Sequence, residues 1–136
     1  MTFLFTPPPG LPLLAALIAR QEGFGVPGAI PTVRHNPGDL RHSPHSWHPT
    51  EDPDGIGYID NDADGWADLV RQLGLDAARS LSLGELIGGW APAEDGNDPA
   101  AYLADLIAGF AAGGVTVAGC TPVAEALKEG CTAEAA

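Results

Sequence analysis

The chain has 136 residues, 45% of them hydrophobic and 18% charged, a balance that suits one globular domain with a buried core. Its formal net charge is −12 with only six Lys and Arg, which excludes a protein whose main contacts are with nucleic-acid phosphates. The same charge removes electrostatic attraction to an anionic membrane or cell wall, so a wall polymer would have to be recognised in a groove.

The N-terminal residues 1–9 predict an extended arm, because the three prolines at 7–9 favour a polyproline II conformation. This segment has no basic residues at its start, and its apolar run is too short for a signal peptide. No stretch of the chain approaches transmembrane length, and we expect no insertion into a membrane.

An apolar helix is predicted over residues 11–20, with Pro12 in its first turn. Glu22 follows at the end of this helix and opens a glycine-rich loop, residues 23–28. Such a carboxylate is well placed for acid chemistry, because the helix can surround it with apolar atoms and raise its pKa. The alternative interpretation is a surface glutamate at the end of a helix.

No helix is predicted over residues 23–64, where Gly, Pro, His and Asp dominate. An irregular segment of this length inside a compact domain usually has a function. Two short strands fit within it, at 39–42 and 57–60, and would pair as a small hairpin.

A second helix is predicted to start near Asp64, with Asp62 or Asp64 as its cap. Its apolar face comprises Trp66, Leu69, Val70 and Leu73. Ser82 and Glu85 fit a capping box that begins a third helix, and this helix should run to Trp90.

A fourth helix is expected with Asn97 or Asp98 as its cap and Pro99 in its first turn. Its apolar face comprises Tyr102, Leu103, Leu106, Ile107 and Phe110. A last short helix should cover residues 121–128. Together these elements predict a mainly helical fold of about five helices, with a long loop or small hairpin region between the first and the second.

One domain over residues 10–130 would then be followed by a C-terminal tail, residues 131–136. Cys120 and Cys131 lie at this end of the chain, and a disulfide between them would close a small loop. Two cysteines alone leave both the bridged and the free state open.

Three groups of residues carry a recognisable pattern when their order and spacing are taken together. Residues 19–25 read Ala-Arg-Gln-Glu-Gly-Phe-Gly, and residues 35–41 read His-Asn-Pro-Gly-Asp-Leu-Arg. Residues 65–69 read Gly-Trp-Ala-Asp-Leu, and Trp90-Ala91-Pro92 precedes Asn97, Asp98 and Tyr102. Over roughly residues 14–110, this pattern resembles the small lysozyme-like domains of phage and bacterial wall-degrading proteins, relatives of lytic transglycosylases and goose-type lysozymes.

The resemblance implies an α+β lysozyme-like fold with a substrate cleft. It makes Glu22 the catalytic acid and Tyr102 a cleft tyrosine. The substrate-binding residues that it implies are His35, Asn36, Gly38, Trp90 and Asn97. His35 and Asp39 depart from the family's pattern, in which asparagine is usual at both positions.

The implied activity is cleavage of the β-1,4 bond between N-acetylmuramic acid and N-acetylglucosamine in bacterial peptidoglycan, without a cofactor. We expect a phage-encoded monomer that acts on the wall glycan. A second carboxylate that holds a water would make the enzyme a hydrolase, and the candidates are Asp39, Glu51 and Asp60. With none in place, Glu22 would activate the sugar's own 6-hydroxyl and give an anhydro product, the transglycosylase route.

The same residues fit other interpretations. Tyr102 is compatible with a core aromatic, and Asn97 with a plain helix cap. The whole chain is also compatible with a non-catalytic wall-binding or virion structural module, or with a chitinase-like enzyme that acts on N-acetylglucosamine polymers.

Two clusters resemble metal sites, although we expect no bound metal. Three histidines recur at every third residue, namely His42, His45 and His48. Pro44 and Pro49 oppose a helix that would bring these imidazoles together. Three aspartates resemble the first half of a calcium loop, namely Asp60, Asp62 and Asp64. The position that needs a bidentate glutamate is Arg71, and capping of a helix start explains the aspartates equally well.

Overall fold

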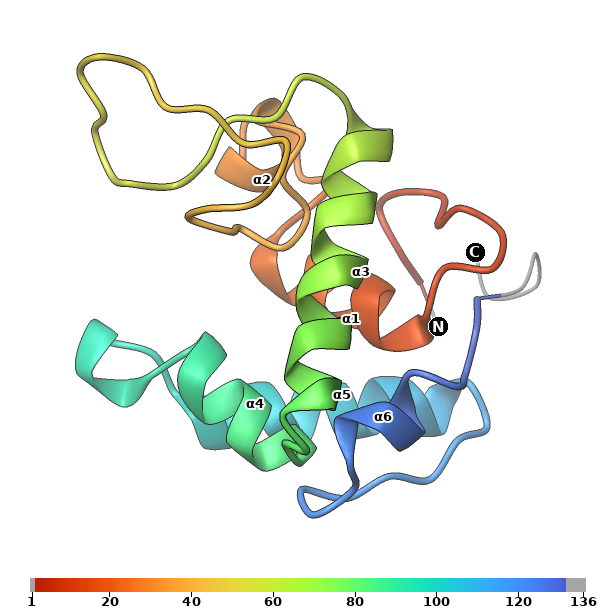
Figure 1. The fold of residues 1–136 in the computed structure, drawn as a ribbon. Helices are drawn as coiled ribbons and strands as arrows, with labels where there is room; N and C mark the ends of the chain where they lie inside the picture. The colour runs from red at the N-terminus through yellow and green to blue at the C-terminus, as the bar shows by residue number, and fades with distance from the viewer. Residues whose placement is uncertain (1, 132–136) are drawn as a thin grey trace.

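The computed structural model describes residues 2–131, and these form a mainly helical fold, as predicted. The helices are α1 (Leu13–Glu22), α2 (Ile30–Val33), α3 (Asp62–Ala78), α4 (Leu83–Trp90), α5 (Pro99–Ala112) and α6 (Val123–Ala126), with a 3₁₀ turn η1 (Ala93–Asp95) before α5 (Figure 1). The described residues contain isolated β-bridges but no β-sheet. Apart from Cys131, the predicted C-terminal tail lies outside the described residues.

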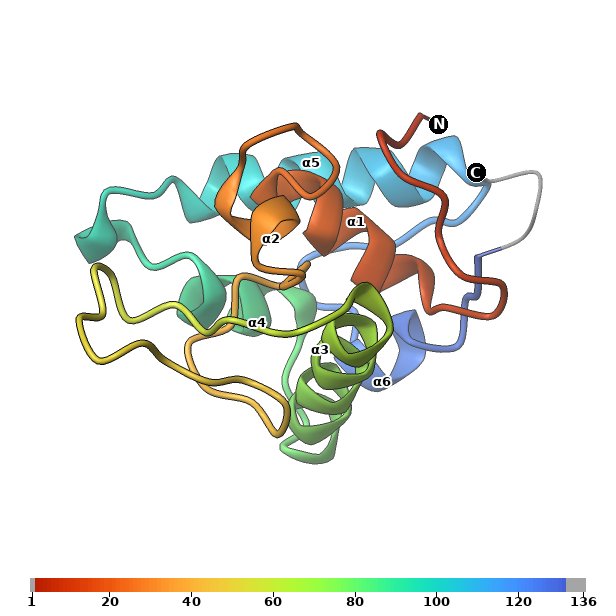
Figure 2. The same ribbon diagram turned by 90° about the horizontal axis from the view of Figure 1, so that it is seen from above.

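α1 is the central helix of the core. Its residues 13–19 are all buried, so this helix is enclosed on every side. It packs against α5 on one flank and α3 on the other, and Figure 2 shows α1 running beside α5. This packing brings the C-terminal end of α1 next to the N-terminal half of α5, which is where the candidate site forms.

The N-terminal arm packs onto this core. The ring of Phe5 lies 5.2 Å from that of Phe24 and 5.5 Å from that of Trp66, between ring centroids. Phe24 and Trp66 are themselves edge to face at 5.1 Å. The residues that the sequence predicts as a separate extended arm therefore contribute to the same hydrophobic cluster as α1 and α3.

Local capping signals account for most helix boundaries. The predicted capping box of Ser82 and Glu85 is present at the start of α4, and Asp98 caps α5. The cap of α3 differs from the prediction: Asn61, and not Asp62 or Asp64, accepts the hydrogen bond from the Asp64 N–H. α3 therefore begins at Asp62, two residues earlier than expected.

The other two predicted helices have different limits from those expected. Pro12 is the N-cap residue of α1 and not part of its first turn, so the helix starts at Leu13. α6 is only one turn long, with Pro122 as its N-cap residue, and does not extend over the predicted residues 121–128.

The segment between α1 and α3 differs from its prediction in two ways. It contains the short helix α2, which has Pro31 in its first turn and is only four residues long. The predicted hairpin does not form, because the backbone groups of residues 57–59 bind three separate segments. Gly57 donates to the Leu40 carbonyl, Tyr58 exchanges two hydrogen bonds with Trp47, and Ile59 donates to the Arg34 carbonyl, each at 2.9 Å.

A buried arginine holds this loop together. The Arg34 guanidinium is 8% exposed and forms a bidentate pair with the Asp54 carboxylate, at 2.7 and 2.9 Å. It also donates to the Ile56 carbonyl at 3.0 Å and lies 4.1 Å from the ring centroid of Tyr58. The loop is thus ordered without a sheet, which makes it a rigid wall for the neighbouring pocket.

Two further findings concern the ends of the chain and the helices. Cys120 is exposed and Cys131 is buried, and both are free thiols, so the bridged alternative is not realised. Within residues 2–131, no helix has the length and the apolar character needed to cross a membrane.

Candidate active site

The candidate site is built around Glu22, the last residue of α1. The helix ends here because Gly23 adopts a left-handed conformation (φ 93°), and its N–H closes the helix on the carbonyls of Ala19 and Arg20. Burial is the largest influence on the Glu22 carboxyl, and it raises the pKa from the ordinary 4.5 to about 6. The negative charge of Asp39 adds to this increase. The direction of this shift agrees with the expectation from the sequence, in which burial at the end of α1 raises the pKa of Glu22.

Tyr102 approaches Glu22 from α5. Its hydroxyl donates a hydrogen bond to Oε2 of Glu22 at 2.7 Å, and the residue is only 8% exposed. This hydrogen bond favours the carboxylate and so lowers the pKa of Glu22, but less than burial raises it. Burial and the charge of Glu22 raise the pKa of Tyr102 itself, which keeps the hydroxyl protonated as a donor. Tyr102 is therefore both a core aromatic and a partner of the acid.

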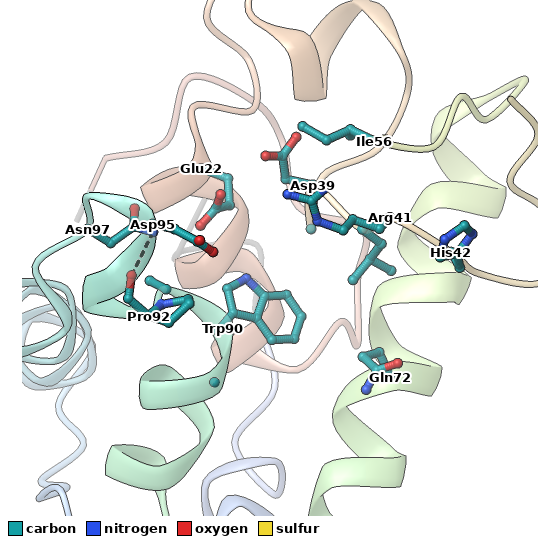
Figure 3. Close-up of a pocket in the computed structure, with 14 residues that line it drawn as sticks. Glu22, Asp39, Arg41, His42, Ile56, Gln72, Trp90, Pro92, Asp95 and Asn97 are labelled. Carbon is teal, nitrogen blue, oxygen red and sulfur yellow. Dashed lines mark hydrogen bonds between the residues drawn. The ribbon is translucent and has the colours of Figure 1, made fainter. Parts of the chain in front are cut away.

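Glu22 faces an open cavity of about 580 Å³. The cavity lies between the loop that precedes α3 and the segment that joins α4 to α5, and Figure 3 shows the side chains that line it. Five of the predicted site residues are among them: Glu22, Gly38, Asp39, Trp90 and Asn97. These residues come from separate parts of the chain, and the fold brings them to one hollow of the surface.

Asp39 supplies a second carboxylate to this cavity. It has a left-handed backbone (φ 54°), a conformation that aspartate and asparagine tolerate better than most residues. Burial raises the pKa of Asp39, against the opposing charges of Arg34 and Arg41. Its Oδ1 atom is buried and has no hydrogen-bond partner among the described residues. Asp39 therefore places a second carboxylate at the cavity, with one of its oxygen atoms buried and unpartnered in the wall.

Two predicted substrate-binding residues lie elsewhere. Asn36 is fully buried, and its amide donates to the carbonyls of Leu40 and Gly57 and accepts from the Leu40 N–H, at 2.8 to 3.0 Å. Its hydrogen bonds hold the turn before Asp39 and leave no atom for a ligand. The His35 ring does not line the cavity, because its Nδ1 lies 2.7 Å from Oδ1 of Asp62 at the start of α3.

The cavity also contains residues that sequence reasoning missed. The polar ones are Arg41, Gln72 and Asp95, and His42 of the predicted histidine cluster lines the cavity as well. Arg41 stands in the recognised segment 35–41, but its side-chain direction depends on the fold of the loop. Asp95 lies on η1, and only the packing of α4 against α5 places it across from Asp39 (Figure 3). The sequence carries no local signal for this convergence.

The other candidate second carboxylates do not reach the cavity. Glu51 is exposed and does not line it, and Asp60 accepts a hydrogen bond from the indole N–H of Trp47 at 3.0 Å. This arrangement leaves Asp39 as the one of the three candidates that shares a cavity with Glu22.

Residues of the predicted metal-like clusters contact neighbouring side chains, and His45 lies near two carboxylates, Asp68 and Asp64. His45 Nδ1 lies 2.6 Å from Asp68, and His48 Nδ1 lies 2.7 Å from Asp52. Asp64 belongs to the first turn of α3 and interacts with the cap Asn61. Over residues 2–131, no three His, Cys, Asp or Glu side chains are grouped so as to hold a metal ion.

Comparisons of the chain with protein-family models, with curated proteins and with solved structures found no match. The case for a function therefore depends on the geometry of the cavity and on the chemistry of Glu22, Tyr102 and Asp39.

Proposed function

We propose that this protein is a glycosidase that cleaves the β-1,4 bond between N-acetylmuramic acid and N-acetylglucosamine in peptidoglycan, with Glu22 as its general acid. The observation that carries the proposal is the half-buried Glu22 carboxyl, with a pKa of about 6, hydrogen-bonded by Tyr102 at the wall of an open cavity. A carboxyl with this pKa is partly protonated near neutral pH, as a general acid must be.

In the proposed first step, Glu22 donates its proton to the glycosidic oxygen as the bond to the anomeric carbon breaks. The leaving sugar then departs with a hydroxyl group, and Glu22 is left as a carboxylate. Tyr102 would stabilise the negative charge that Glu22 gains in this step. Its hydroxyl remains a hydrogen-bond donor and binds the Glu22 carboxylate more strongly than the protonated carboxyl. The hydrogen bond also fixes the direction of the carboxyl.

The second step requires a nucleophile at the positively charged anomeric carbon. Asp39 is suited to assist, because its carboxylate lines the cavity, where it can take the proton of an attacking water, and because its negative charge favours the cationic transition state. With that water, the products are those of hydrolysis. Without it, the Glu22 carboxylate takes the proton of the sugar's 6-hydroxyl, whose oxygen then closes an anhydro ring.

The shape of the cavity supports a polymer as the substrate. It is open to solvent and is lined by an aromatic ring, Trp90, together with the amide groups of Gln72 and Asn97. Such a mixture of apolar surface and hydrogen-bonding groups suits a sugar chain that carries acetamido groups. The proposed reaction uses side chains of one copy of the chain.

The direct test is Glu22→Gln on purified peptidoglycan. We expect the rate of turbidity loss to fall by about 10²- to 10⁴-fold, the contribution of a general acid. Glu51→Gln is the matched control, because it removes an exposed carboxylate that does not line the cavity, and it should keep the wild-type rate.

The Glu22→Gln variant should still fold. The folded state holds the Glu22 proton more tightly than the unfolded chain, so wild-type stability decreases as the pH rises from about 4.5 to about 6. At pH 7 this ionisation lowers the free energy of unfolding of the wild type by about 2 kcal/mol at most. The glutamine variant has no carboxyl to ionise and avoids this loss. Its melting temperature at pH 7 should therefore be no lower than that of the wild type. Lysis by this variant at the wild-type rate would reject Glu22 as the acid.

Product masses decide between the outcomes that the site permits. Hydrolysis products are one water heavier than anhydro products. Cleavage of N-acetylglucosamine oligomers but not of peptidoglycan would indicate the chitinase-like alternative. A wild-type protein that binds peptidoglycan without cleaving it would be a wall-binding module.

A further inference from the structure

The six cationic residues of the chain occupy very different places. Three lie beside carboxylates, at 2.7, 3.8 and 3.1 Å, namely Arg34, Arg79 and Lys128. Arg20 lies over the ring of Phe3, and Arg71 is exposed on α3 and does not line the cavity. Among residues 2–131, Arg41 is the one Arg or Lys that lines the cavity containing Glu22.

Most N–H donors of the Arg41 guanidinium make no hydrogen bond within the described residues. It makes one described hydrogen bond, from Nη1 to the backbone carbonyl of Asp54 at 3.1 Å. A guanidinium has five N–H donors, so most of them are free for another acceptor. No carboxylate of residues 2–131 forms an ion pair with it, and the buried Oδ1 of Asp39 has no hydrogen-bond partner. Arg41 is thus a cation at the cavity whose charge is not used in a direct pair.

The charges around Arg41 restrict where an anionic ligand can bind. Glu22, Asp39 and Asp95 also line the cavity, so most of its surface repels an anion. Figure 3 shows Glu22 and Arg41 on opposite sides of the hollow, with Trp90 between them. A ligand that carries a carboxylate would therefore place this group at Arg41, whose planar fork matches carboxylate geometry.

We infer that Arg41 is a specificity-determining residue that binds a carboxylate attached to every second sugar of the glycan. This inference rests on the proposed function and names its preferred substrate. The carboxylate has two sources: the lactyl group of a strand without stem peptides, or an acidic residue of a stem peptide. Because the carboxylate recurs on alternate sugars, its pairing with Arg41 also decides which of the two kinds of β-1,4 bond lies beside Glu22.

Binding to the inactive Glu22→Gln protein tests this without turnover. Calorimetry would compare four glycans of equal length: a bare strand with free lactyl carboxylates, the same strand with lactyl methylamides, a strand with stem peptides, and a neutral N-acetylglucosamine oligomer. We expect one carboxylate-bearing strand to bind about tenfold more tightly than the methylamide strand, the effect of one charge-assisted hydrogen bond. The tighter of the bare and peptide-bearing strands identifies the source of the carboxylate.

Adding Arg41→Gln to this protein should reduce the carboxylate preference to less than twofold and leave the Kd of the neutral oligomer unchanged. Arg41→Lys should keep an intermediate preference, because the charge remains and the fork is lost. Arg71→Gln is the matched control, since it removes the same charge from outside the cavity, and it should keep the full preference.

Two results would overturn the inference while the proposed function stands: an unchanged carboxylate preference in Arg41→Gln, or an equal loss of affinity for all four glycans. The second result would mean that Arg41 only supports the loop through Asp54. Failure of all four glycans to bind the Glu22→Gln protein would overturn the proposed function and the inference together.

Discussion

At the scale of single residues, the proposed reaction requires Glu22 and Asp39 to hold opposite protonation states in the same cavity. Burial raises the pKa of both carboxyls, and each of them has charges nearby. Glu22 must keep its proton to act as the acid, whereas Asp39 must lose its own to assist a water.

The first prediction at this scale concerns the pH dependence of kcat/KM. The rate should rise as Asp39 ionises and fall as Glu22 loses its proton near pH 6, which gives a bell-shaped profile. The measurement is the rate on a soluble glycan between about pH 3 and pH 9. A rate that continues to rise above pH 7 would show that the group with a pKa of about 6 is not the acid.

The neighbours of Glu22 should shift this profile in opposite directions. Tyr102→Phe removes a hydrogen bond that favours the carboxylate, so the pKa of Glu22 should rise and the alkaline limb should move to higher pH. Asp39→Asn removes a repelling charge, so the pKa of Glu22 should fall. Carboxyl titration by NMR measures both shifts, including in a variant with little activity. Shifts of the same sign in the two variants would contradict the proposed site.

At the scale of elements, the turn that carries Asp39 rests directly on α3. Gly65 lies in the first turns of α3, and a Cβ atom there would collide with the carbonyl oxygen of His35 and lie 2.7 Å from Cδ of Pro37. The turn can approach the helix only because position 65 has no side chain. The Gly65-Trp66 pair thus combines a contact surface for the turn with an aromatic anchor in the core.

The prediction for this element is that Gly65→Ala displaces the turn. We expect a loss of about 1–3 kcal/mol of stability from the clash and a lower kcat, because Asp39 moves with the turn. Gly74→Ala, on the same helix, is the matched control, since a Cβ there has open space around it. That change should add about 0.5–1 kcal/mol through helix propensity and leave kcat unchanged. Chemical denaturation and steady-state kinetics would measure both variants, and equal effects of the two would contradict this role.

At the scale of the whole molecule, the net charge of −12 opposes approach to an anionic cell wall. Arg41 acts only at short range and does not change this long-range repulsion. In the proposed function, the net charge would set the rate of encounter with the wall, while the cavity would set which glycan binds.

The prediction for the whole molecule is an increase in the rate of lysis with salt. Raising the ionic strength from about 0.01 M to about 0.15 M shortens the Debye length from about 30 Å to about 8 Å and screens the repulsion. Lysis of intact anionic walls should accelerate over this range, whereas the rate on a neutral N-acetylglucosamine oligomer should stay constant. A decrease in wall lysis over the same range would show that attraction, not repulsion, dominates the encounter.

Most of the helical framework could be predicted from the sequence, because its signals are local. The capping box of Ser82 and Glu85 and the cap at Asp98 involve residues three apart, and the end of α1 depends on Gly23 directly after Glu22. The start of α3 was mispredicted because Asn61 stands among several aspartates that are equally good caps. Local reasoning cannot choose between neighbouring residues of the same capping ability.

The site could be predicted only in part. The sequence predicts Glu22, Asp39 and Tyr102 as site residues, but it cannot show which second carboxylate shares a cavity with Glu22. Asn36 was misassigned because a buried amide and a substrate-binding amide look alike in a sequence. Arg41 and Asp95 were missed because their position depends on how the loop and η1 are packed.

The sequence by itself determined the helical class, the capping box of α4 and the position of Glu22 at the end of a buried helix, because these follow from apolar periodicity and from contacts within a few residues. The tertiary structure alone decided the hydrogen bond between Tyr102 and Glu22, the extent to which the Glu22 carboxyl is buried and the placement of Arg41 across the cavity from it. Burial and the convergence of side chains are properties of α1, α5 and the loop packed together, and no single segment contains them.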